Sequence, residues 1–149
     1  MRRAAFALGV ALCCAPSVAG CGGDERLSRT EFVERATAVC ARAEEQIGGL
    51  AAPASEDELA AYAREARAIT EQSVADLREL EPPEPLERGF DRYLERAHEV
   101  VDLLEELEGA AADGNSEEAR RIAGQIGTSA EAQEAARAAG IAACEDGES

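Results

Sequence analysis

Helical periodicity is the sequence feature that most constrains the fold of this chain. Apolar residues recur at steps of three and four in four segments, residues 28–50, 55–80, 84–108 and 115–139. This spacing places the apolar side chains on one face of a helix, and no segment shows the alternation typical of a half-buried strand. The sequence therefore predicts an all-α protein.

The ends of these segments carry capping and breaking signals. Ser28 and Ser55 each precede a glutamate by three residues, which is the spacing of a capping box at the start of a helix. Pro82-Pro83 stops the second segment, because proline lacks the amide that would continue a helix and restricts the residue before it. Glycine-containing breaks end the last two segments, at Gly109, at Asp113-Gly114-Asn115 and at Gly140.

Four amphipathic helices joined by short links predict an antiparallel four-helix bundle of up-down-up-down topology. In that arrangement the fourth helix returns beside the first. An extended helical hairpin or coiled-coil pair is the alternative, but the apolar stripes are wide enough to favour the compact bundle. The fourth segment is rich in alanine, so it can approach its neighbours closely while burying little surface.

The first residues have the pattern of an export signal. Arg2 and Arg3 precede an apolar run over residues 4–15, which is too short to span a membrane and has the length of a signal-peptide h-region. The following Val18-Ala19-Gly20-Cys21 resembles the lipobox of bacterial lipoproteins, in which the cysteine receives a diacylglycerol and begins the mature chain. An ordinary secretory signal followed by a cysteine is the alternative.

This pattern divides the chain into three parts. Residues 1–20 are expected to be a lipoprotein signal peptide, residues 21–27 the lipidated Cys21 with a flexible tether, and residues 28–149 the helical domain. Two acyl chains hold a protein stably on a bilayer. The expected location is therefore the extracytoplasmic face of the cell membrane.

The charge balance restricts the partners that the chain can have. It contains 31 acidic residues against 15 Lys and Arg, for a formal net charge of −16. Nucleic-acid binding needs cationic side chains that displace counterions from phosphates, and an acidic surface also repels anionic lipid headgroups. We therefore expect no nucleic-acid partner, membrane attachment through the diacylglycerol on Cys21, and a basic protein as the kind of partner that fits.

The five cysteines reduce to one pair after processing. Cys13 and Cys14 would leave with the signal, and Cys21 would be consumed by lipidation. Cys40 and Cys144 remain in an oxidising compartment, which predicts a disulfide between them. Two independent buried thiols are the alternative. Metal ligation is disfavoured, because neither cysteine lies in a Cys-x-x-Cys pattern or near a histidine.

The third segment holds an incomplete metal-site pattern. His98, the single histidine, follows Glu95 by three residues, so both side chains share a helical face, and Asp102 lies one turn further on. Di-iron bundles use two Glu-x-x-His motifs and two further carboxylates, whereas this chain has one such motif. A partly solvated histidine among acidic residues is therefore the preferred interpretation.

Acidic residues also gather at the end of the third segment: Asp102, Glu105, Glu106, Glu108 and Asp113. Negative charge at a helix C-terminus opposes the helix dipole and costs about 0.3–1 kcal/mol per group. Such a local inconsistency can mark function. Binding of a divalent cation or of a basic partner would explain it, and so would a solvated acidic face.

Tyr62 and Tyr93 fall on the apolar stripes. They are either packed tyrosines with a hydroxyl at the rim or part of a ligand pocket between the helices. Motifs of serine hydrolases, zinc proteases, phosphate loops and haem attachment do not occur. We therefore expect no enzymatic activity and no cofactor.

A set of expected packing residues and the two cysteines is distributed along the domain: Glu31-Phe32-Val33, Ala36, Ala38-Val39-Cys40-Ala41, Leu80, Pro82-Pro83, Phe90, Tyr93-Leu94, Gly140-Ile141 and Cys144. This pattern resembles small, mostly uncharacterised lipoproteins of high-GC Gram-positive bacteria. The resemblance implies a disulfide-tied helical domain and carries no activity.

Two functions therefore enter as hypotheses. The first is a non-enzymatic binding or interaction module at the cell surface, which uses the acidic face or a groove between helices. The alternative is a bundle that binds a small ligand or a metal at a site built around Tyr62, Tyr93, Glu95 and His98. Such a site could also be catalytic. Salt-sensitive binding to a basic partner would favour the first hypothesis.

Overall fold

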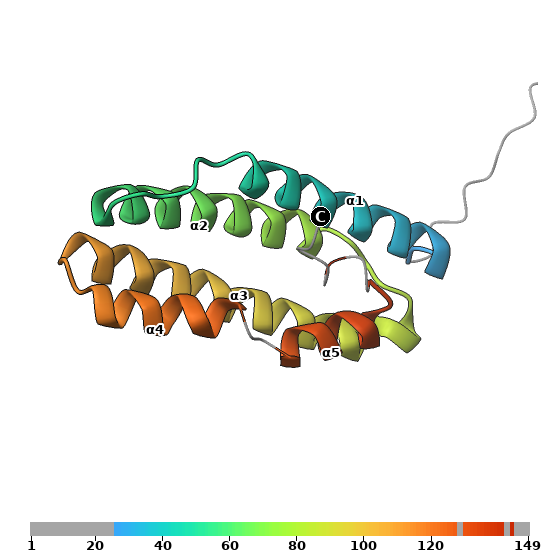
Figure 1. Ribbon diagram of the computed structural model, residues 1–149. Coiled ribbons are helices and arrows are strands. Elements are labelled where there is room, and N and C mark those ends of the chain that lie inside the picture. The colour runs from blue at the N-terminus through green and yellow to red at the C-terminus, as the bar shows by residue number, and fades with distance from the viewer. Residues whose placement is uncertain (1–25, 128–129, 142–143, 145–149) are drawn as a thin grey trace, which may run out of the picture.

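The computed structural model describes residues 26–127, residues 130–141 and Cys144 (Figure 1). The predicted signal peptide, Cys21 and nearly all of the predicted tether lie outside these residues. The described residues form five α-helices and no strand, so the all-α prediction is confirmed. The helices are α1 (Arg29–Gly48), α2 (Glu56–Arg78), α3 (Glu84–Ala112), α4 (Ser116–Gly127) and α5 (Ala130–Ala139).

The region predicted as one fourth helix is divided into two. Helix α4 ends at Gly127, and α5 begins at Ala130. Glycine is about 1 kcal/mol less favourable than alanine in a helix interior. Gly124 and Gly127 therefore make one uninterrupted helix through this stretch unfavourable, a local signal that the apolar spacing alone does not reveal.

The other helix boundaries agree with the local signals, with one extension. The Oγ of Ser28 accepts from the backbone N–H of Glu31 at 3.3 Å, and Glu31 Oε2 accepts from the N–H of Ser28 at 3.1 Å, which completes the capping box. Helix α3 continues through Gly109 to Ala112, because Ala111 beyond it is buried. The chain then turns at Gly114, which has a φ of +70°.

The helices lie in two layers, with α1 and α2 side by side in one and α3, α4 and α5 in the other (Figure 1). Helix α3, the longest at 29 residues, packs against α2, α4 and α5, while α1 packs against α2. At 1.5 Å per residue α3 is about 43 Å long. It is therefore the element that connects the two ends of the molecule.

The apolar interior is formed by two clusters at different places along α3. The first core combines α1, α2, α3, α5 and the residue after Gly140, and includes Phe32, Ala36, Cys40, Leu77, Phe90, Ala139 and Ile141. Its Phe32 and Phe90 rings meet edge to face with centroids 5.0 Å apart. The second core consists of Ala63, Leu107, Ala119 and Ile122 and joins α2, α3 and α4. Helix α5 thus belongs to the first core and α4 to the second.

Helices α3 and α5 approach each other backbone to backbone at Gly89. This glycine is buried, and a Cβ added to it would lie 2.5 Å from the carbonyl carbon and oxygen of Ala138. Only a residue without a side chain allows this separation of the two helices. The alanine-rich sequence of α5 permits the same closeness from the other side.

Candidate functional site

Cys40 and Cys144 form the disulfide that the cysteine arithmetic predicts. Their Cα atoms lie 5.3 Å apart, although the residues are 104 positions apart in sequence. Cys40, on α1, is only 5 % exposed, whereas Cys144 is half-buried. The bond joins the residues that follow α5 to the middle of α1.

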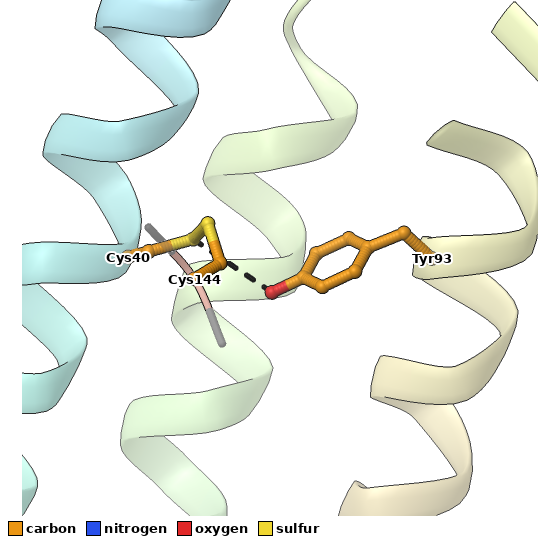
Figure 2. The surroundings of a disulfide bond; sticks show 3 residues. All are labelled: Cys40, Tyr93 and Cys144. Carbon is orange, nitrogen blue, oxygen red and sulfur yellow. Dashed lines mark hydrogen bonds between the residues drawn. A yellow bond between two sulfur atoms is a disulfide. The ribbon is translucent and has the colours of Figure 1, made fainter. Parts of the chain in front are cut away.

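Tyr93 projects from α3 toward this disulfide (Figure 2). Its hydroxyl lies 3.7 Å from the Sγ of Cys40. A disulfide sulfur carries no hydrogen, so the phenol is the donor in this contact. Burial raises the pKa of Tyr93 to about 12, and the nearby carboxylate of Glu44 acts in the same direction. The phenol therefore keeps its proton throughout the physiological pH range.

A surface hollow of about 230 Å³ lies beside Tyr93 and Cys144. Its other lining residues come from α2, α3 and α5 and are Thr70, Arg96, Ala97, Val100, Ala132 and Gln133. Arg96 is held in place by Glu99 at 2.6 Å and by Glu131 of α5 at 3.0 Å. The half-buried cysteine thus borders a space that solvent can enter.

Tyr62 lies elsewhere. It lines a different hollow, of about 160 Å³, between the chain that links α1 to α2 and the first turns of α2, where Leu50, Pro53, Glu58 and Glu65 are among its neighbours. The structure therefore does not bring Tyr62 and Tyr93 into one pocket. The two tyrosines lie on different helices, α2 and α3, and a ligand pocket that includes either of them stays a prediction.

The metal-site pattern on α3 is not assembled. The guanidinium of Arg78, on α2, donates a hydrogen bond to Nε2 of His98, so a metal at this nitrogen would have to displace a cation. Glu95 and Asp102 are exposed on the helix surface. Within the described part of the chain, no three His, Cys, Asp or Glu side chains are grouped as metal ligands.

The acidic end of α3 is partly neutralised by α2. Arg64 Nε lies 2.7 Å from Glu108 Oε1, and Arg67 lies 3.4 Å from Glu105 and 3.5 Å from Glu108. The sequence shows no sign of this pairing, because the paired residues are 44 positions apart for Arg64 and Glu108 and 38 positions apart for Arg67 and Glu105. Asp102, Glu106 and Asp113, named in the same prediction, are exposed.

The same end of the molecule gathers acidic residues from two further helices. Helix α2 begins with Glu56-Asp57-Glu58, and α4 begins with Ser116-Glu117-Glu118. The Ser116 hydroxyl donates to Glu56, so the start of α4 contacts the start of α2. We define the acidic end as the exposed carboxylates of Asp57, Glu106, Asp113 and Glu117.

The sequence did not predict the groove between α3 and α5. A groove of about 550 Å³ runs between the start of α3 and the end of α5, and Pro85, Arg88, Gly89, Asp91, Arg92 and Ala138 line it. The one signal available in the sequence is the one-turn spacing of Arg88 and Arg92 beside a glycine. Arg88, Asp91 and Arg92 are all exposed to solvent. The groove therefore has no buried polar side chain that would fix a ligand.

Comparison of the chain with protein-family models, with curated proteins and with solved structures gives no match. Among the helices of the described residues, none is both long and apolar enough to cross a membrane. The described residues define an all-helical protein tied by the Cys40–Cys144 disulfide. Its function is inferred from its own residues.

Tyr93 should make the protein sensitive to alkali. Because its pKa is about 12 in the folded state and 10.0 in the unfolded chain, the native state binds more protons between these two values, and stability falls as the pH rises through them. We expect a loss of about 2 kcal/mol in the free energy of unfolding between pH 10 and pH 12. Denaturant titrations at each pH measure it. An unchanged slope in Tyr93→Phe would contradict the assignment.

Proposed function

We propose that this protein is an extracytoplasmic lipoprotein, anchored to the cell membrane by a diacylglycerol on Cys21, whose helical domain is a non-enzymatic module for binding a basic partner. The observation that carries the proposal is the Cys40–Cys144 disulfide. Such bonds persist in oxidising compartments, and this pairing leaves Cys21 as the one cysteine still available once a signal over residues 1–20 is removed. The small lipoproteins of high-GC Gram-positive bacteria are the proteins that this chain resembles.

The proposed architecture is an antiparallel up-down-up-down bundle in which α4 and α5 together take the fourth position. The links between α1, α2, α3 and α4 are short, which favours antiparallel neighbours. The first core supports closure of the bundle, because it contains residues of α1 together with Ala136 and Ala139 of α5.

The start of helix α1, which follows the proposed anchor in the sequence, lies at the opposite end of the domain from the acidic end. Helix α1 begins eight positions after Cys21, at the end of the molecule where α3 also begins (Figure 1). The acidic end lies where α2 starts and α3 finishes, about 43 Å away along α3. A short tether would therefore hold the acidic end away from the anionic headgroups and present it to a basic protein.

The lipid anchor on Cys21 is tested by measuring the mass of the intact protein. Protein released from its own membranes in mild detergent is measured under denaturing conditions, with and without reductant, and also under native conditions. We expect a chain that begins at a diacylated Cys21 and gains two hydrogens on reduction. An unlipidated chain that begins elsewhere would refute the anchor, and a co-purifying metal or small molecule would replace the interaction module with a ligand-binding bundle.

Binding of a basic partner at the acidic end is tested by neutralising its carboxylates. Neutralising the acidic end with Asp57→Asn, Asp113→Asn and Glu117→Gln together should weaken binding of an oligo-arginine peptide about tenfold at low salt, since exposed ion pairs contribute about 0.2–1 kcal/mol each. The matched control neutralises three exposed carboxylates near the opposite end, with Glu34→Gln, Glu81→Gln and Asp91→Asn. Isothermal titration at two salt concentrations measures both. Equal weakening in the two variants would show a diffuse charge effect and reject the acidic end as the site.

A further inference from the structure

The two sulfurs of the disulfide have unequal surroundings. Cys40 belongs to the first core and is 5 % exposed. Cys144 is half-buried and borders the 230 Å³ hollow between α2, α3 and α5. A thiol that arrives from solvent through this hollow therefore meets Cys144 rather than Cys40.

Tyr93 makes its hydrogen-bond contact with the sulfur of Cys40. Its hydroxyl lies 3.7 Å from the Sγ of Cys40 (Figure 2). When a disulfide is attacked, negative charge develops on the sulfur that leaves, and the rate rises as that thiolate becomes more stable. A hydrogen bond donated to an ionised acceptor is about twice as strong as one between neutral groups. The phenol is thus placed to stabilise Cys40 as the leaving thiolate.

We propose that the Cys40–Cys144 disulfide is a site of thiol–disulfide exchange, in which a small polar thiol attacks Cys144 and displaces Cys40. The thiolate sulfur of the attacking molecule uses a lone pair to form a new S–S bond to the Sγ of Cys144. The electron pair of the old S–S bond leaves with the Sγ of Cys40, which accepts a hydrogen bond from Tyr93 and then takes a proton from water. The external thiol is oxidised to the mixed disulfide, and Cys40 is reduced.

The size and lining of the hollow set the class of thiol. A volume of about 230 Å³ admits a small molecule, and Thr70, Arg96 and Gln133 give it a polar wall. The residues that precede Cys144 are held by packing as well as by the bond, because Ile141 and Ala139 are fully buried in the first core. The mixed disulfide can therefore form while the helices stay packed.

The test uses reduced glutathione as the probe, added to the oxidised full-length protein released from membranes. After quenching with acid and alkylation of free thiols, peptide mapping by mass spectrometry locates the glutathione. We expect glutathione on Cys144 and the alkylating group on Cys40. Glutathione on Cys40 would overturn the proposal, as would modification that proceeds only at the rate of global unfolding.

The role of Tyr93 is tested by Tyr93→Phe, for which we expect exchange about fivefold slower, since part of the hydrogen bond to the thiolate forms in the transition state. A purely structural role would give the opposite sign, because looser packing exposes the disulfide and speeds attack. Tyr62→Phe, in a separate hollow, is the matched control and should leave the rate unchanged. An unchanged or faster rate in Tyr93→Phe would overturn the assigned role. The peptide map of the unmodified sequence stays decisive if that variant does not fold.

This inference is independent of the proposed basic partner. It concerns the chemistry of two sulfurs at the first core, whereas the charge experiment concerns carboxylates beside the second core. Failure of either experiment therefore leaves the other interpretable.

Discussion

Replacement of both disulfide cysteines, with Cys40→Ala and Cys144→Ala, is expected to lower the free energy of unfolding by about 4.7 kcal/mol. This is the chain-entropy value for a closed loop of about 100 residues, and the bond here joins residues 104 positions apart. Domains of this size are stable by about 5–15 kcal/mol. The loss would therefore remove between about a third and nearly all of the stability.

Alanine is the suitable replacement, because Cys40 is only 5 % exposed and a serine there would bury a hydroxyl. Denaturant unfolding of the oxidised protein, of the double variant and of Cys144→Ala measures the effect. The single variant removes the same cross-link, so it should lose nearly as much as the double variant. A loss below about 1 kcal/mol in both would contradict the assignment of this stability to the bond and would attribute it to packing of Ile141 in the first core.

Gly89→Ala is the second substitution with a large expected effect. The added Cβ would lie 2.5 Å from the backbone carbonyl of Ala138 and 2.7 Å from the nitrogen of Ala139, so α5 would have to move away from α3. Overpacking of this kind costs about 1–3 kcal/mol or more, which exceeds the gain of about 1 kcal/mol in helix propensity. We expect a net loss of stability and weaker protection of α5 in hydrogen exchange.

Gly109→Ala provides the matched control. Gly109 is exposed on the same helix, and nothing lies within 4 Å of the Cβ that the substitution would add. Only the propensity gain remains, so this variant should be more stable by up to about 1 kcal/mol. Opposite signs for two identical substitutions in one helix are the expected result. Stabilisation by Gly89→Ala as well would contradict the close packing of α3 and α5.

The sequence by itself determined the features that depend on neighbours along the chain. Helical spacing, the capping box of Ser28 and Glu31 and the stop at Pro82-Pro83 all act within one or two turns, so the first three helices could be predicted without tertiary information, whereas the division of the fourth into α4 and α5 was missed. Cys40 and Cys144 could be paired because the proposed removal of the signal peptide and lipidation of Cys21 would leave no other cysteine for either of them.

The tertiary structure alone decided how the helix surfaces meet. It placed Arg64 and Arg67 opposite Glu108, Arg78 against His98, and Tyr93 beside the disulfide but apart from Tyr62. It also required Gly89 to be a glycine. Each of these depends on the rotation and the relative height of two packed helices. Packing of the two cores sets the rotation and the relative height of the helices. The period of 3.6 residues shows only which face of one helix is apolar, so it does not predict how two helices meet.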